Sequence, residues 1–196
     1  QYNRFIAALD YMATEGIDPG IRHLANSGAV THFPDFRFDM VRAGLLLYGY
    51  FPGGLVSNEL PVAPAMELAA DVALVKRVPA GASVGYGATV QLSEDRYIAL
   101  LPMGYADGIP RTLKTPIEVT IAGRRYPLIG RVSMDQVTVD LGAETTIKAG
   151  DRAIFFGANG ASTADDWAKA AGTISYEILS RIGGRVPRLA GRINPY

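Results

Sequence analysis

The sequence contains no cysteine, and its 196 residues include only two histidines, His23 and His32. The absence of cysteine excludes disulfide scaffolds, thiolate zinc sites, iron–sulfur clusters and cysteine nucleophiles. Because the two histidines have no acidic partner in a ligand pattern, we expect no metal site. No apolar run approaches the roughly 18 residues that a membrane span needs, so we expect no membrane partner.

The chain also lacks an excess of either charge, since Lys and Arg together number 19 and Asp and Glu together number 19. A surface that binds nucleic acid or an anionic membrane usually leaves a basic excess, so we expect neither partner. Charged residues make up 19% of the chain, which is below the roughly 25% usual for soluble domains. The low charge indicates that part of the surface is covered, for instance by another subunit.

The first 50 residues have the pattern of an α/β fold. Apolar residues at helical spacing predict a helix over residues 3–15 that ends at Gly16. Residues 21–25 predict a short strand, residues 28–39 an irregular segment, and residues 40–48 a second apolar strand. A helix followed by strands is typical of α/β proteins.

The character of the sequence changes at the Pro/Gly-rich residues 51–54, where we place a domain boundary between residues 1–50 and 51–196. Beyond it, apolar residues alternate with period two in several short runs. The strands predicted from this alternation lie at residues 68–74, 97–102, 117–121, 137–141 and 152–156. Short strands with Gly and Pro turns favour an antiparallel barrel or sandwich.

Smaller signals complete the prediction for this second part. Ala122-Gly123 is a hairpin turn signal. Two helices are expected, at residues 165–171 with a cap at Ser162 or Thr163, and at residues 176–182.

Polar residues occur at unusual places in the first 50 residues. His23 to Ser27 ends the first strand with polar groups, and in α/β barrels the carboxyl ends of strands carry the chemistry. From the chemistry alone, a packed histidine followed by an Asx turn is the better interpretation. Arg42 lies in an apolar strand, where it is either buried against a bidentate acceptor or placed on a solvated face.

Two tyrosines and one turn stand out in the second part. Tyr86 and Tyr105 each lie between small residues, which taken alone indicates amphipathic packing. Residues 130–136 concentrate polar groups after a strand, and a hydrogen bond from the backbone to Asp135 would explain them as a turn.

Taken in order, these segments resemble the alanine racemase family of pyridoxal-phosphate (PLP) enzymes. The matching segments are residues 23–28, 42–44 with 48–49, 85–89, 104–108, 130–136 and 173–177. No single segment is specific, but the ordered set is. The implied fold is the end of a PLP-binding (β/α)₈ TIM barrel, residues 1–50, followed by a mostly β, antiparallel barrel-like C-terminal domain, residues 51–196.

The resemblance implies an activity: interconversion of L-alanine and D-alanine through a PLP aldimine, which supplies D-alanine for peptidoglycan in the cytoplasm. The family uses two bases, a Lys that forms the Schiff base and a Tyr from the neighbouring subunit of a homodimer. The Tyr matches Tyr86. The four lysines are Lys76, Lys114, Lys148 and Lys169. None lies in a matching context, so we expect the Schiff-base lysine to be missing from this chain.

The same resemblance implies roles for further residues. His23 and Arg42 match side chains that support the tyrosine, and Arg42 also matches the residue that meets the PLP pyridine nitrogen. The residues implied to bind the cofactor are Ser27, Arg42, Gly44, Leu45 and Tyr176. The residues implied to bind the substrate are Met134, Asp135 and Tyr105, and Arg111 matches a residue of the passage through which it enters. Tyr86 and Met134 would complete the partner's active site.

Two alternatives stay open. One is a racemase with another substrate, such as serine, lysine or several amino acids. The other is a non-catalytic fragment that binds PLP poorly and is inactive without the rest of the barrel.

Overall fold

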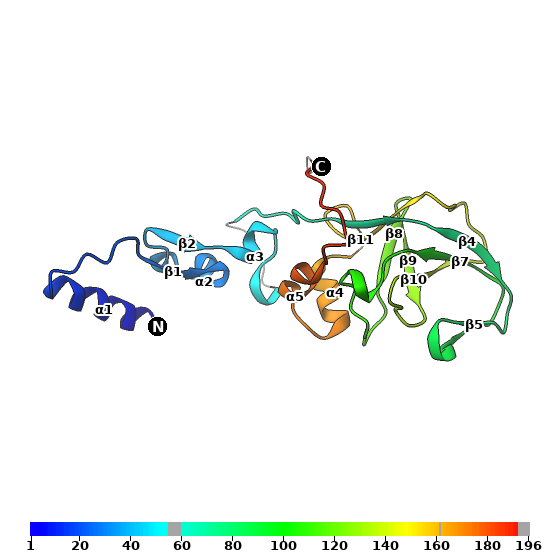
Figure 1. The fold of residues 1–196 in the computed structure, drawn as a ribbon, viewed down its shortest axis with the longest axis horizontal. Helices are drawn as coiled ribbons and strands as arrows, with labels where there is room; N and C mark the ends of the chain where they lie inside the picture. Colours follow the sequence, from blue (N-terminus) through cyan, green and yellow to red (C-terminus); the bar gives the residue numbers. More distant parts are fainter. Residues whose placement is uncertain (55–59, 161, 192–196) are drawn as a thin grey trace. The chain divides into compact units, whose positions relative to one another are not determined.

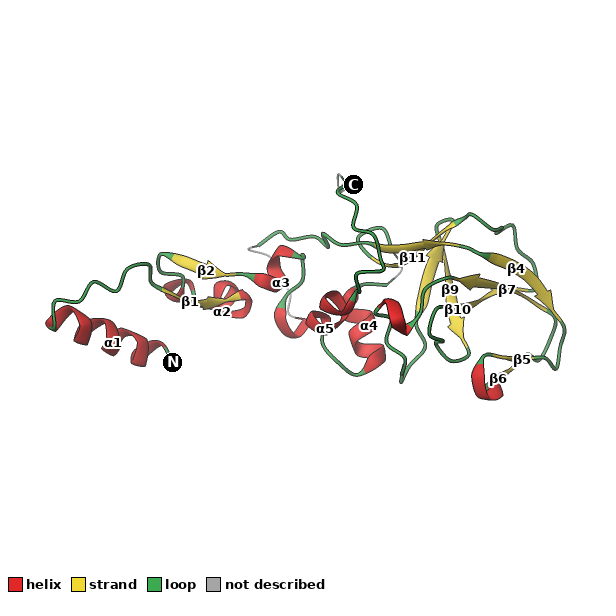
Figure 2. Cartoon of the chain, viewed as in Figure 1, coloured by secondary structure: helices red, strands yellow, loops and turns green. Residues whose placement is uncertain are grey.

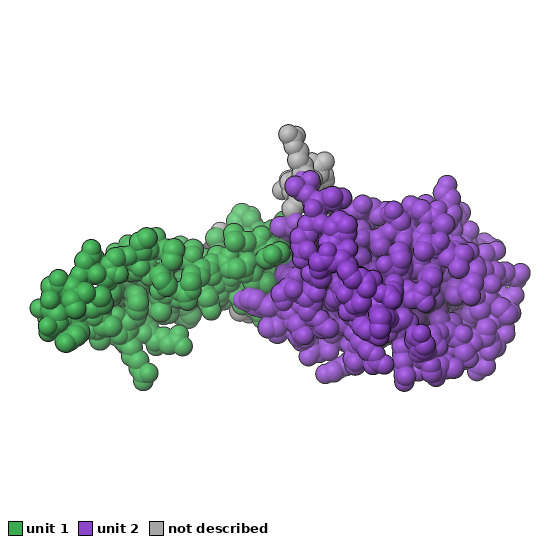
Figure 3. Space-filling view, viewed as in Figure 1, with its two compact units in different colours: residues 1–63 green, residues 64–196 purple. Residues whose placement is uncertain are grey.

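The structure is a computed structural model that describes residues 1–54, 60–160 and 162–191 (Figure 1). The chain divides into two compact units, residues 1–63 and residues 64–196, coloured green and purple in Figure 3. The predicted domain boundary after residue 50 stays a prediction. Each unit is described by itself.

The first unit, in residues 1–54 and 60–63, combines helices with one pair of strands. Its elements are α1 (Tyr2–Thr14), β1 (His23–Asn26), α2 (Ser27–His32), η1 (Pro34–Phe36), β2 (Met40–Arg42), α3 (Gly44–Leu47) and η2 (Pro52–Gly54). Strands β1 and β2 pair in parallel. Among the described residues of this unit, the buried apolar side chains are Ala25, Leu45 and Tyr50. The helix predicted at the start of the chain is present as α1, and no residue of α1 is buried.

An ion pair supports the parallel strand pair from just outside it. The Arg22 guanidinium binds Asp39 with two hydrogen bonds, Nε to Oδ2 at 2.7 Å and Nη2 to Oδ1 at 2.8 Å. The backbone N–H of Arg22 also donates to Asp39 Oδ2 at 2.9 Å. These bonds stabilise the carboxylate and lower the pKa of Asp39 to about 2. The pair joins the residue before β1 to the residue before β2.

Two predictions for this unit were wrong. Residues 28–39 are not irregular, because Asn26 Oδ1 accepts a hydrogen bond from the Ala29 backbone N–H at 3.0 Å and caps α2. Residues 40–48 are not one strand, because the chain turns at Ala43 and continues as α3. Short apolar runs do not distinguish strand from helix by periodicity alone.

The second unit is built on a seven-stranded antiparallel sheet (Figure 2, yellow). Its strands are β3 (Leu68–Asp71), β4 (Leu74–Val78), β7 (Arg96–Leu101), β8 (Glu118–Ile121), β9 (Arg124–Ile129), β10 (Val137–Gly142) and β11 (Arg152–Phe156). Its described residues also form a separate hairpin and four helical segments: β5 (Ser83–Val84), β6 (Val90–Gln91), η3 (Tyr86–Ala88), η4 (Tyr105–Asp107), α4 (Ala164–Ala171) and α5 (Ser175–Arg181).

The sheet curls because of how its strands are ordered. The hydrogen-bonded order is β3-β11-β8-β9-β10-β7-β4, so β3 and β4 lie at opposite ends although only Val72 and Ala73 separate them in sequence. The two ends of the sheet must therefore approach each other at these two residues. The backbone N–H of Val72 donates to Asp151 on one side, and that of Ala73 donates to Leu100 on the other.

Most of the predicted strands and turns of this unit are present. Ala122 and Gly123 have φ of +48° and +75° and form the predicted turn between β8 and β9, which is the geometry of a tight hairpin. The predicted strand 68–74 was wrong at its end, because the sheet partner changes at Val72 and Leu74 is 47% exposed.

Helix α4 closes the core over β11. Trp167 and Phe155 are fully buried, and the indole Nε1–H donates to the Phe155 carbonyl at 2.7 Å. Thr163 caps the helix, as predicted, by accepting a hydrogen bond from the Asp166 N–H, and Gly172 ends it with a left-handed φ of +74°. The second unit thus has a core of its own.

Within the described ranges, the helices are all too short or too polar to cross a membrane.

Candidate active site

Five of the residues singled out from the sequence line one cavity in the second unit. The cavity has a volume of about 310 Å³. The predicted residues in its wall are Tyr86, Tyr105, Arg111, Met134 and Asp135. They come from η3, from η4 and the loop after it, and from the loop before β10. These three segments are far apart in sequence. This convergence makes the cavity the candidate active site.

The turn that carries Tyr86 is packed against Arg131. Gly85 and Gly87 have φ of +73° and +75°, which favours glycine at both positions. A Cβ on Gly87 would lie 3.0 Å from Arg131 Nη1, and a Cβ on Gly85 would lie 3.1 Å from the Arg131 backbone nitrogen. The two glycines therefore allow the backbone of this turn to lie close to Arg131. Tyr86 is 75% exposed.

The loop with Met134 is held against the helical turn with Tyr105. The backbone N–H groups of Tyr105 and Ala106 donate to the carbonyls of Ser133 and Met134, both at 3.0 Å. A Cβ on Gly104 would lie 2.3 Å from the Ser133 carbonyl oxygen. Only glycine fits there without displacing the loop.

A guanidinium joins the same two segments. Asp107 is buried and accepts a hydrogen bond from the Gly104 N–H at 2.9 Å. Arg185 Nε lies 3.1 Å from Asp107 Oδ1, and Arg185 Nη2 donates to Asp135 Oδ1 at 2.8 Å. The hydrogen bond to Asp135 and the charge of Asp107 raise the pKa of Arg185.

Sequence reasoning missed Arg131 and Arg185. Arg131 lies inside the segment 130–136 that carried the resemblance, so its place there was an available signal. Arg185 lies 50 residues from Asp135, and no local pattern connects them.

His23, the first residue of β1, and Arg42, the last residue of β2, meet through their side chains in the first unit. The prediction that His23 lies at the carboxyl end of its strand was wrong, because β1 begins at this residue. Arg42 Nη1 lies 2.6 Å from His23 Nδ1. Because a guanidinium can only donate, Nδ1 is the acceptor and the ring proton belongs on Nε2. Both side chains are exposed in this chain, and the role of Arg42 stays a prediction.

Ser27, Gly44 and Leu45 gather at the starts of two short helices. Ser27 is buried, and its Oγ lies 3.4 Å from the Leu46 backbone nitrogen, so α2 and α3 begin next to each other. The N-cap residue of α3, Ala43, makes no side-chain hydrogen bond to the helix, and the space beside Gly44 is open for 4 Å around a Cβ position. A hydroxyl, backbone N–H donors and open space suit an anion of phosphate size.

Tyr176 lies on α5 in the other unit and is 41% exposed. Its assignment to the cofactor stays a prediction, as do the roles of the other site residues.

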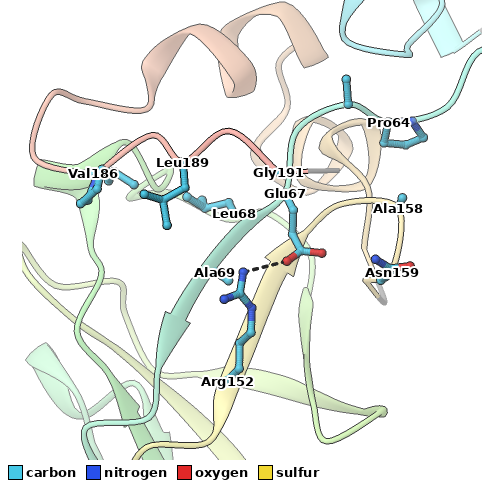
Figure 4. A pocket seen from close by; sticks show the side chains of 12 residues that line it. Pro64, Glu67, Leu68, Ala69, Arg152, Ala158, Asn159, Val186, Leu189 and Gly191 are labelled. Carbon is cyan, nitrogen blue, oxygen red and sulfur yellow. Dashed lines mark hydrogen bonds and ion pairs between the residues drawn. The ribbon is translucent and has the colours of Figure 1, made fainter. Parts of the chain in front are cut away.

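A larger cavity of about 560 Å³ in the second unit holds none of the predicted residues. Its wall includes the ion pair between Arg152 Nη2 and Glu67 Oε1 at 3.0 Å, drawn in Figure 4 with Leu189 and Asn159. In the described part of the chain, His, Asp and Glu side chains form no group that could hold a metal ion.

Comparisons with known proteins define the class. Residues 1–52 match the family model described as alanine racemase, N-terminal domain, and residues 65–190 match that of the alanine racemase C-terminal domain. Both models describe a family of isomerases. It belongs to the alanine racemase family.

Named relatives agree. The chain is 45% identical to the alanine racemase of Frankia casuarinae over 96% of its own length and 50% of the relative's. A crystal structure of alanine racemase from a D-cycloserine-producing Streptomyces lavendulae has a TM-score of 0.84 at 46% identity, with 97% of this chain and 51% of that chain covered. The structure of alanine racemase from Bacillus anthracis with bound L-Ala-P has a TM-score of 0.88 at 36% identity, with 100% and 50% covered.

The chain spans about half the length of the curated relatives it matches. Its fold, the end of a TIM barrel followed by a C-terminal domain with a curled antiparallel sheet, is the one the sequence predicted.

Proposed function

We propose that this chain is part of a PLP-dependent enzyme that interconverts L-alanine and D-alanine. The observation that carries the proposal is the cavity where Tyr86, Tyr105, Met134 and Asp135 converge. Racemisation removes the α-proton from one face of the substrate and returns one to the other, so it needs a proton-transferring group on each face. Tyr86 is the group that this chain supplies.

The residues of the first unit fit the cofactor that the family implies. PLP, when bound, withdraws electron density from the substrate's α-carbon. Ser27 and the backbone N–H groups of Gly44 and Leu45 would hold its phosphate, with the Tyr176 hydroxyl as a further donor. Arg42 would meet the pyridine nitrogen, and the hydrogen bond to His23 Nδ1 fixes the direction of its guanidinium.

Tyr86 and Met134 act, in this proposal, on the cofactor site of a second copy. Both side chains are exposed in this chain, at 75% and 53%. Because tyrosine and methionine are enriched at protein–protein interfaces, their exposure supports an interface at this position. The proposed assembly is a homodimer in which each copy completes the other's site. The proposed location is the cytoplasm, and the proposed use of D-alanine is peptidoglycan.

The proposal also covers what this chain does not supply. Residues 1–50 would be the end of the PLP-binding barrel and residues 51–196 the β domain. The opposite proton-transferring group, the Schiff-base lysine, would lie outside this sequence, and these 196 residues alone would be inactive. Borohydride reduction followed by mass spectrometry tests whether the Schiff-base lysine lies outside this sequence. PLP fixed to Lys76, Lys114, Lys148 or Lys169 would refute it.

The deciding experiment compares the full-length protein with its Tyr86→Phe variant. We expect the full-length protein to convert each enantiomer of alanine and the variant to lose roughly 10²–10⁴-fold in kcat, as for loss of a general acid–base group. Exchange of the α-proton with deuterated water is measured separately from L-alanine and from D-alanine. Full activity of the variant in both directions would refute the role of Tyr86.

A racemase for another amino acid is separated from this proposal by a substrate panel. Alanine, serine and lysine are supplied at equal concentration, and the highest kcat/KM should belong to alanine.

A further inference from the structure

Arg185 pairs with two carboxylates at the candidate active site: Asp135, which lines the cavity, and Asp107, which lies in the turn that carries the lining residue Tyr105. It reaches Asp107 at 3.1 Å and Asp135 at 2.8 Å. Asp107 closes the helical turn that carries Tyr105, since it accepts from the Gly104 N–H. Asp135 follows Met134 directly. The side chain of Arg185 therefore links the helical turn η4, called the tyrosine turn below, to the loop of residues 133–136.

The segment that carries Arg185 is itself fixed to the tyrosine turn. The backbone N–H of Gly183 donates to the Asp107 carbonyl at 3.0 Å. A Cβ on Gly108 would lie 2.6 Å from the Arg181 carbonyl oxygen, so the two backbones are in close contact. The guanidinium of Arg188 donates to the Ile182 carbonyl at 2.8 Å. Arg185 thus extends from an anchored backbone, whereas Asp135 has a side chain 59% exposed.

The positive charge of Arg185 also offsets the negative charges of the two carboxylates. Asp107 and Asp135 place two negative charges near a cavity that, in the proposed function, receives the carboxylate of an amino acid. Arg185 pairs with both. Without it, the exposed Asp135 would repel an incoming anion beside Met134. A planar guanidinium can bond two acceptors at once, which a lysine ammonium does with less directional fit.

We propose that Arg185 is a positioning residue for substrate binding: it fixes the loop of residues 133–136 and offsets the charge of Asp135, so that the substrate carboxylate can bind at Met134. This inference rests on the proposed function. Arg185 acts through Asp135 and takes no part in proton transfer. Its loss should therefore weaken carboxylate binding more than it slows the chemical step.

The first test is kinetic, on the full-length holoenzyme. For Arg185→Ala we expect the KM for alanine to rise about fivefold, the order of magnitude for two partly exposed ion pairs, with kcat changed less than twofold. The inhibition constant of propionate, a carboxylate without the amino group, should rise by the same factor. Arg185→Lys should recover part of both. A drop in kcat at constant KM, or an unchanged propionate constant, would overturn the proposal.

The second test does not depend on racemisation. Hydrogen exchange of the amides in residues 133–136 is compared between wild type and Arg185→Ala, because the Ser133 N–H donates to the Gln136 carbonyl within this loop. We expect faster exchange in the variant. Unchanged exchange would overturn the positioning role even if alanine proved not to be the substrate, and an inactive wild type would instead refute the proposed function.

The matched control is Arg77→Ala. Arg77 pairs with Asp95 at 2.8 Å and is 65% exposed, so its removal also breaks a surface ion pair in the same unit. It does not line the candidate cavity. We expect KM, the propionate constant and exchange in residues 133–136 to match wild type. Equal effects from both variants would show that Arg185 acts only through general stability.

Discussion

The two units of the chain hold their functional residues by different means. In the second unit a buried core of sheet and helices, with Trp167 and Phe155 at its centre, supports loops in close backbone contact. In the described part of the first unit few apolar side chains are buried. The local geometry is set by backbone N–H groups that donate to the side-chain oxygens of Asn26 and Asp39. Position is therefore set by packing in one unit and by polar contacts in the other.

The largest expected difference between the units comes from truncating a fully buried side chain in the core of the second unit. Trp167→Ala should lower the free energy of unfolding by about 3–5 kcal/mol, because it leaves a large cavity and removes the donor to the Phe155 carbonyl. Urea unfolding followed by circular dichroism measures it. Tyr11→Ala, at a position 64% exposed in the first unit, is the control and should change little. Equal costs for the two variants would contradict the comparison.

A smaller effect is expected from adding one methyl group where backbones touch. Gly104→Ala places a carbon 2.3 Å from the Ser133 carbonyl oxygen and should cost about 1–3 kcal/mol through overpacking. Gly44→Ala in the first unit meets nothing within 4 Å and should not destabilise. Thermal unfolding of both variants checks the difference. A neutral Gly104→Ala would mean that the loop of residues 133–136 is not held tightly.

Matched helix caps give a finer test. Asn26→Ala removes the cap of α2 and Thr163→Ala that of α4, each at about 1 kcal/mol. Hydrogen exchange at the Ala29 and Asp166 amides should report a local loss in both variants. Only Thr163→Ala should also speed exchange in the neighbouring β11, because α4 packs on it through Trp167. Faster exchange in elements beyond α2 in the Asn26→Ala variant would contradict the distinction between the two units.

The smallest effect is a dependence on pH in the first unit. Asp39 has a pKa of about 2, below its ordinary 3.8, because Arg22 bonds its ionised form. The ion pair therefore contributes fully to the stability of the first unit above pH 4, and this contribution is lost as the pH falls toward 2. Amides of β1 and β2 should lose protection from exchange over this range in wild type. Asp39→Asn should lack that pH-dependent loss, and a wild-type titration midpoint near 3.8 would contradict the bond.

The sequence predicted the second unit better than the first for a physical reason. Period-two alternation and the Ala122-Gly123 turn indicate strands wherever one face is buried, and this unit buries such faces. In the first unit the signal for α2 was one capping side chain, Asn26, and the run from Gly44 to Leu47 suits strand and helix alike.

The residues of the candidate active site also differ in how well the sequence predicted them. Tyr86, Tyr105 and Met134 could be found because they lie in segments with recognisable order along the chain. Arg185 could not, because its partner Asp135 is a long-range neighbour that only the folded backbone brings within reach.

The curled sheet has a consequence for synthesis on the ribosome. Strand β3 is made first, yet its only partner in the sheet is β11, the last strand of the described chain to be made. Strand β4 can pair with β7 much earlier. One end of the curl thus stays an unpaired edge until nearly the whole domain has emerged. Contacts this distant in sequence form slowly, so the interval in which β3 is open should be the period when the nascent chain most needs protection from aggregation.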